Sequence, residues 1–324
     1  QGGGGLNGSV GTPTGAQYSG NRSALQRGFA VASTDSGHQG AVFDASFFAD
    51  QEAALDFLYQ AVGEATVVAR QIVARHYGKD ADLAYFVGCS TGGREAMMMS
   101  QRFPRYFDGI LAVAPAMRTS FSNLGLRHAA MALNAIAPRD AAGKPRTRDA
   151  LSDEGRALIL AGVLESCDAL DGHADGLIFA PHSCRFDPGT LECKREKAGQ
   201  CLTREQVNAV RRVMAGPRTS SGRQVYPGYY FDTGITNTQG LAGILAAPFI
   251  PEGPAPDTTM DVDAAAAEAM SARAMVGDTA AWTNLSTFRG HGGKLIFVHG
   301  VSDPWFSAQD TVQYYERLAG DNAD

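Results

Sequence analysis

A serine between two glycines is the residue of this chain whose surroundings best suit covalent chemistry. Residues 88–92 read Gly-Cys-Ser-Thr-Gly, so Ser90 is the centre of a G-x-S-x-G pattern. An apolar run at 83–87 precedes it and a helix-like run at 93–103 follows it. Between a strand and a helix, this pattern makes a sharp turn that exposes the serine hydroxyl, and the helix N-terminus favours developing negative charge. The pattern predicts that Ser90 is a nucleophile. A tight glycine turn with a surface serine is the alternative.

A nucleophilic serine of this kind needs an acid and a histidine later in the chain. Asp303 lies shortly after the apolar run at 294–298, where a carboxylate of such a triad is expected. The acid would hold the histidine tautomer and stabilise the imidazolium. We therefore predict that Asp303 is the triad acid. A turn aspartate before Pro304 is the alternative interpretation.

The histidine of the triad is harder to assign. None of the seven histidines follows Asp303. His299 precedes the acid closely and is better placed to line the substrate pocket, together with Trp305 and Phe306. We therefore expect the catalytic histidine to lie beyond Asp324.

Acyl transfer also needs backbone N–H groups that stabilise an oxyanion. One donor should be the amide of Thr91, the residue after the nucleophile. The second should come from the glycine run at 2–5, because glycine lets the backbone approach a substrate closely. We predict that Gly4 or Gly5 supplies it. A flexible N-terminal segment is the alternative.

An acidic, glycine-containing loop follows at 168–177. Asp168, Asp171 and Asp175 present carboxylates within a short span, and oxygen ligands of this type are those that calcium prefers. The spacing differs from that of an EF-hand, and the closing glutamate is absent. The loop therefore predicts a calcium site. A solvated acidic turn, or zinc bound through His173, are the alternatives.

The five cysteines are unevenly distributed. Four of them fall between residues 167 and 201, which favours disulfides and an oxidising compartment, so we expect a secreted or periplasmic protein. Zinc is the competing interpretation, although the chain has no C-x-x-C pair. Cys89 is left over, either as a free thiol or with a partner outside this chain.

Apolar runs and helical spacing alternate in the first third of the chain, which predicts a parallel sheet with helices on both faces. Strands are expected at 28–32, 83–87, 109–113 and 294–298, and helices at 50–77, 93–103, 152–165, 203–214 and 308–318. The pattern weakens between 117 and 290. We therefore expect a catalytic domain at 1–116 and 291–324, interrupted by a long insertion at 117–290.

Composition narrows the choice of partners. The 324 residues are 44% hydrophobic and carry a net charge of −6. The net negative charge disfavours nucleic acid as a partner. No apolar run approaches the roughly 20 residues of a membrane span. A small molecule is the expected partner, whereas the oligomeric state is not predicted. The chain opens on a glycine run that is typical of a domain interior, so we expect an enzyme truncated at both ends.

Three segments together resemble the tannase and feruloyl esterase family: residues 2–8, 88–95 and 299–305. The resemblance implies an α/β-hydrolase fold with a large lid insertion. It also implies disulfides Cys167–Cys184 and Cys193–Cys201, and a bond from Cys89 to a cysteine beyond residue 324. For calcium, it implies the side chains of Asp168, Asp171 and Asp175 and the carbonyls of His173 and Leu177.

The function implied is that of a serine carboxylester hydrolase with a Ser-His-Asp acyl-enzyme mechanism. Its substrates would be aromatic-acid esters of the feruloyl, galloyl or terephthalate monoester type. Calcium would be structural, and no cofactor would enter the chemistry. There are two alternatives. One is another serine acyl hydrolase, such as a peptidase or lactonase, and the other is a non-catalytic binding protein on a hydrolase fold. Without its histidine, this chain alone would be nearly inactive.

Overall fold

The computed structural model describes residues 1–12, 21–194, 201–246 and 258–323. It separates into two compact units. The first unit comprises residues 1–118, 275–299 and 313–324, and the second comprises 119–274 and 300–312. Residues 275–290, which the sequence places in the insertion, thus belong to the unit that holds the sheet. Asp303 belongs to the second unit.

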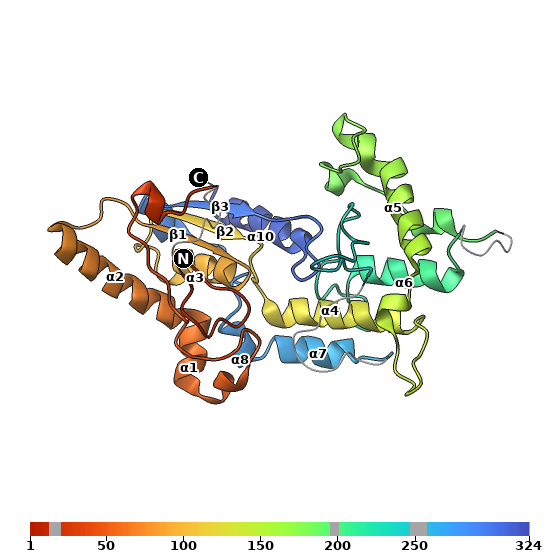
Figure 1. The fold of residues 1–324 in the computed structure, drawn as a ribbon, viewed down its shortest axis with the longest axis horizontal. Coiled ribbons are helices and arrows are strands. Elements are labelled where there is room, and N and C mark those ends of the chain that lie inside the picture. Colours follow the sequence, from red (N-terminus) through yellow and green to blue (C-terminus); the bar gives the residue numbers. More distant parts are fainter. Residues whose placement is uncertain (13–20, 195–200, 247–257, 324) are drawn as a thin grey trace. The chain divides into compact units, whose positions relative to one another are not determined.

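The first unit is built on three parallel strands, β1 (Tyr85–Cys89), β2 (Gly109–Val113) and β3 (Lys294–Val298), in that order across the sheet (Figure 1). The register pairs Val87 with Leu111, and Leu111 with Ile296. The second and third strands have the predicted bounds, and the first lies two residues later than predicted. Because all three strands are parallel, their carboxyl ends meet at one edge of the sheet, where sites of α/β proteins form.

Only one face of this sheet is well covered within the described residues. Phe86, Ile110 and Phe297 point to the covered face and pack with α3 (Thr91–Arg102), whose three methionines at 97–99 are fully buried. On the other face, Tyr85 is 51% exposed and Ile296 is 59% exposed. Within the described residues, the prediction of helices on both faces is confirmed for one face and stays a prediction for the other. The apolar runs suggested two buried faces, because both sets of side chains are hydrophobic.

The predicted strand at 28–32 is wrong. A 3₁₀ turn, Leu25–Arg27, ends at Gly28 with a left-handed φ of 89°. The residues that follow, 29–36, run without strand pairing. An apolar run becomes a strand only when a neighbour supplies a ladder of backbone hydrogen bonds. In the described chain this run has no such ladder, although the Gln1 amine donates to Ala32 O at 3.1 Å.

A long helical segment follows as predicted. It consists of α1 (Gln51–Leu55), a π-helical turn at Asp56–Gln60 and α2 (Ala61–Tyr77), and it ends at Gly78. Asp50 caps its start by accepting the Ala53 N–H. A 3₁₀ turn at Ser46–Ala49 precedes this segment. Three further helices lie later in the chain: α8 (Ala272–Met275), α9 (Ser286–Gly290) and α10 (Ala308–Asp321).

The second unit is helical. It holds α4 (Thr119–Asn134), α5 (Asp153–Cys167), α6 (Arg204–Ala215) and α7 (Val262–Ala269), with short 3₁₀ turns at Thr147–Asp149, Asp168–Asp171, Pro181–Ser183 and Pro188–Leu191. Helices α5 and α6 confirm two predictions, and their N-caps are Ser152 and Thr203. Helix α4 is buried on most sides, which hides the periodicity of an amphipathic helix and explains why it was not predicted. In the described part of the chain, no helix combines the length and the apolar character needed to cross a membrane.

Candidate active site

The structure places Ser90 at a sharp turn between β1 and α3. Its backbone has φ 60° and ψ −118°, a conformation that residues with a side chain rarely adopt. Three backbone hydrogen bonds hold it there. Ser90 N–H donates to Val113 O of β2 at 3.0 Å, and Ser90 O accepts the N–H groups of Ala116 and Arg94 at 3.0 and 3.1 Å. The strained serine is thus fixed by two strands and the first turn of the helix.

Gly92, the second glycine of the motif, must lack a side chain because the backbone of the N-terminal glycine loop approaches it closely. A Cβ at Gly92 would lie 2.7 Å from Gly3 O and 2.9 Å from Gly2 C. The G-x-S-x-G pattern therefore serves the docking of the N-terminal glycine loop as well as the turn itself.

The glycine run at 2–5 lies against the start of α3, as the oxyanion prediction requires. Gly92 N–H donates to Gly3 O at 3.0 Å, and the Thr91 hydroxyl donates to Gly5 O. Gly4 between them is exposed, and a Cβ added there would meet nothing within 4 Å. The loop is thus anchored on both sides of an open glycine. The alternative of a flexible N-terminal segment does not fit these contacts.

The buried carboxylate of Glu95, which was not predicted from the sequence, binds the backbone of this loop. Glu95, only 1% exposed on α3, accepts the Gly3 N–H at 3.1 Å. It also accepts the Asn7 side-chain amide at 2.9 Å and the Ser36 hydroxyl at 3.0 Å. Burial raises the pKa of Glu95, and the neighbouring Arg94 and the three donors oppose that rise. The signal in the sequence was a charged pair, Arg94-Glu95, within a helix of buried residues.

Asp303 has the geometry of a turn aspartate. Its Oδ1 accepts the N–H groups of Trp305 and Phe306 at 2.8 and 3.1 Å, and its own N–H donates to Gly300 O at 3.0 Å. This arrangement fixes the carboxylate in orientation. Its charge, together with burial as the larger cause, raises the pKa of Tyr229. The turn and a catalytic role are compatible, so the assignment of Asp303 as the acid stays a prediction.

The predicted pocket residues lie at the turn around Asp303. Trp305 and Phe306 are both half-buried, and their rings meet edge to face with centroids 6.4 Å apart. His299 directly follows β3 and is half-buried. Cys89, the last residue of β1, is a free thiol within the described chain. Nothing in these contacts assigns a substrate role, and those roles stay predictions.

The acidic loop is folded around backbone amides. Asp168 accepts the Gly176 N–H, Asp171 accepts those of His173 and Phe179, and Asp175 accepts that of Leu177. Hydrogen bonds from these amides lower the pKa of Asp171, which keeps it anionic. Within the described residues, no three acidic, histidine or cysteine side chains converge on one point. The donor chemistry suits calcium, and the calcium site stays a prediction.

Two disulfides confirm the predicted pairing. Cys167 is bonded to Cys184, and Cys193 to Cys201, with sequence separations of 17 and 8 residues. The first bond joins the end of α5 to the segment that follows the acidic loop. It therefore fastens the ends of that loop and excludes these four cysteines as zinc ligands.

Comparison with known proteins decides the family. The sequence profile described as "Tannase and feruloyl esterase" matches residues 1–280. The chain belongs to the tannase and feruloyl esterase family. It is 35% identical to a mono(2-hydroxyethyl) terephthalate hydrolase from Piscinibacter sakaiensis. The alignment is 383 residues long with its gaps and covers 98% of this chain and 63% of that protein. It is 30% identical over 305 aligned residues to a probable feruloyl esterase B-2 from Aspergillus flavus, with 90% of this chain and 56% of that protein covered.

Solved structures support the same assignment. The crystal structure of feruloyl esterase B from Aspergillus oryzae matches with a TM-score of 0.75 and 28% identity, over 98% of this chain and 62% of that one. The fold is that of an α/β-hydrolase. The chain therefore spans about three fifths of the length of these relatives.

Proposed function

We propose that the protein containing this chain hydrolyses esters of aromatic acids, with Ser90 as the nucleophile. The observation that carries the proposal is the strained turn at Ser90, with φ 60°, clamped between β1, β2 and α3. Two curated relatives are described as hydrolases of such esters. A disulfide-bonded, secreted or periplasmic enzyme fits this proposal.

In the proposed mechanism, Ser90 Oγ attacks the ester carbonyl while a histidine accepts its proton. The N–H groups of Thr91 and of Gly4 or Gly5 stabilise the oxyanion, and the alcohol leaves with the proton from the histidine. Water then attacks the acyl-enzyme, and the acid is released. Asp303 would orient the histidine, which we expect from beyond Asp324. Glu95 positions the glycine loop through Gly3.

A substrate panel tests this proposal. The protein containing this chain is assayed with methyl ferulate, a gallate ester and a terephthalate monoester, and with a peptide amide and an aliphatic lactone. We expect turnover of the aromatic esters and a loss of about 10⁴-fold in Ser90→Ala. Preferred hydrolysis of the peptide or the lactone would replace the proposal with another serine acyl hydrolase. Failure to turn over any ester would favour a binding protein.

We further propose that the acidic loop binds one calcium ion through Asp168, Asp171 and Asp175, with the carbonyls of His173 and Leu177. The loop ends are already tied by Cys167–Cys184, which lowers the entropy lost on binding. A chelator should then lower Tm, because a ligand of the folded state stabilises it. Asp171→Ala should abolish that sensitivity. An unchanged Tm on chelation would contradict the proposal.

A further inference from the structure

The loop that carries Asp303 is bound by another segment of the second unit. We call residues 300–307 the acid loop and residues 226–234 the cradle. Both segments belong to the same compact unit, although they lie about 70 residues apart in the sequence. None of the cradle residues was predicted as a site residue from the sequence.

The cradle holds Ser302, the residue before Asp303, through its hydroxyl. Ser302 Oγ donates to Asp232 Oδ2, and the same oxygen accepts the Gly234 N–H at 3.2 Å. Asp232 is only 6% exposed, so water is a poor substitute for this hydrogen bond. A Cβ at residue 234 would lie 2.5 Å from Ser302 Cβ, so the cradle backbone approaches this closely only because residue 234 is a glycine.

Two tyrosines of the cradle hold the C-terminal half of the acid loop. The Tyr229 hydroxyl donates to Pro304 O at 3.4 Å, and the Tyr226 hydroxyl accepts the Ser307 N–H at 3.0 Å. The Ser307 hydroxyl donates to the cradle backbone. Tyr226, Tyr229 and Ser307 are all buried, and burial raises the pKa of Tyr229, which keeps its hydroxyl a neutral donor. The acid loop is thus held on both sides of the aspartate.

The carboxylate of Asp303 follows the backbone of the acid loop. Its Oδ1 accepts the N–H groups of Trp305 and Phe306, and its own N–H donates to Gly300 O. Because these partners all belong to the acid loop, a shift of Ser302 is passed directly to the neighbouring carboxylate.

We propose that Ser302 and Asp232 are positioning residues for the triad acid, because their hydrogen bond fixes the loop that presents the Asp303 carboxylate. The proposal rests on the proposed function. Neither residue acts on the substrate itself; both act through Asp303, which orients the histidine and stabilises the imidazolium. Misplacement of a catalytic group by about 1 Å can cost about 10²-fold in rate. Since Asp232 lies in the insertion predicted at 117–290, this insertion would support the chemistry.

Turnover of the aromatic ester that the protein hydrolyses best tests this hydrogen bond. Ser302→Ala removes the donor, Asp232→Ala removes the acceptor, and Asp232→Asn keeps an acceptor oxygen. We expect kcat to fall about 10²-fold in both alanine variants, with KM changed by less than about twofold. Asp232→Asn should retain kcat within about fivefold of that of the unmodified protein.

The pH profile separates positioning from a general loss of structure. The acid limb of kcat/KM reports the pKa of the histidine, which a nearby carboxylate raises. A displaced Asp303 carboxylate raises it less, so the limb should move to lower pH by at least about 0.5 in Ser302→Ala. Amide exchange of Trp305 and Phe306, whose N–H groups donate to Asp303 Oδ1, should quicken at least about tenfold in the same variant.

Thr147→Val is the matched control. It removes from the same unit a hydroxyl that donates to the buried Asn134 Oδ1 at 2.6 Å, and it should change neither kcat nor the acid limb. If the unmodified protein is active and Ser302→Ala keeps both its kcat and its acid limb, the positioning role alone is wrong. An equal loss of kcat in Thr147→Val would show a general loss of structure and would also overturn it. Turnover of no ester by the unmodified protein would overturn this proposal together with the proposed function.

Discussion

The buried carboxylate of Glu95 is the residue that links the nucleophile helix to the glycine loop. Its three donors come from Gly3, Asn7 and Ser36, which lie far from it in the sequence. Glu95→Ala would leave these donors without an acceptor in a buried place, at a cost of about 3 kcal/mol in the free energy of unfolding. Urea unfolding at pH 7 measures this loss. A change below about 0.5 kcal/mol would show that the network does not support the fold.

The pKa of Glu95 also predicts a pH dependence. Because burial raises this pKa, the folded state holds the proton more tightly than the unfolded state does. Stability from this group is therefore present at low pH and declines as pH rises past the ordinary carboxyl range. Glu95→Gln should flatten that decline between pH 4 and pH 7 in urea titrations. A steeper decline in Glu95→Gln than in the unmodified protein would contradict the direction of the shift.

His128 on α4 predicts the opposite trend. Burial lowers its pKa to about 4, and its Nδ1 is buried without a hydrogen-bond partner in the described chain. The unfolded state takes up a proton near pH 6.5, so stability is lost as pH falls from there toward 4, by up to about 3 kcal/mol. His128→Leu should remove this acid-sensitive component. Thermal unfolding followed across pH 4 to 7 measures it, and an unchanged acid dependence in the variant would contradict it.

At the scale of elements, the junction of β1 and α3 depends on the absence of a side chain at Gly92. A Cβ there would lie 2.7 Å from Gly3 O, so Gly92→Ala should push the glycine loop away from the helix. We expect a fall in Tm of several degrees, and a loss of esterase activity of about 10²-fold, because displaced donors no longer stabilise an oxyanion. Gly290→Ala, where a Cβ meets nothing within 4 Å, is the matched control and should change neither.

The elements that sequence reasoning found are those with local signals. Strand β2 and helices α5 and α6 have clear apolar periods or capping residues, such as Thr203 with Gln206, so their bounds follow from short segments. The strand expected at 28–32 fails because pairing depends on a neighbour that is not visible in the run itself. Helix α4 fails for a different reason, since burial on most sides removes the contrast between polar and apolar faces.

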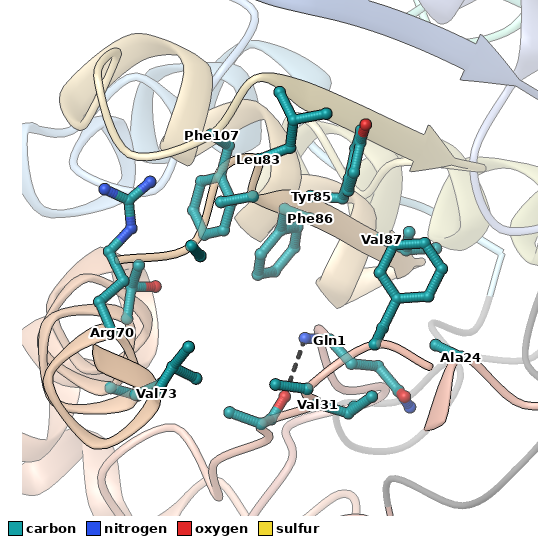
Figure 2. A pocket seen from close by; sticks show the side chains of 18 of the residues that line it. Gln1, Ala24, Val31, Arg70, Val73, Leu83, Tyr85, Phe86, Val87 and Phe107 are labelled. Carbon is teal, nitrogen blue, oxygen red and sulfur yellow. Dashed lines mark hydrogen bonds between the residues drawn. The ribbon is translucent and has the colours of Figure 1, made fainter. Parts of the chain in front are cut away.

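At the scale of the whole molecule, the candidate site could be predicted only in part. The turn at Ser90, the contact of the glycine run with α3 and the two disulfide pairs follow from motifs and the family resemblance. The Glu95 network could not be predicted, because its members lie at residues 3, 7, 36 and 95 and meet only through folding. The hollow of about 740 Å³ between α2, β1 and residues 24–34 could not be predicted either, since it arises from two segments that do not pair (Figure 2).

Labelling with a serine-directed fluorophosphonate tests the central claim most directly. The protein containing this chain is treated with the probe, digested and mapped by mass spectrometry. We predict a single adduct on Ser90, lost in Ser90→Ala and retained in the control Ser220→Ala, whose exposed serine lies in the second unit. An adduct on another residue, or labelling that persists undiminished in Ser90→Ala, would contradict the assignment of Ser90 as the nucleophile.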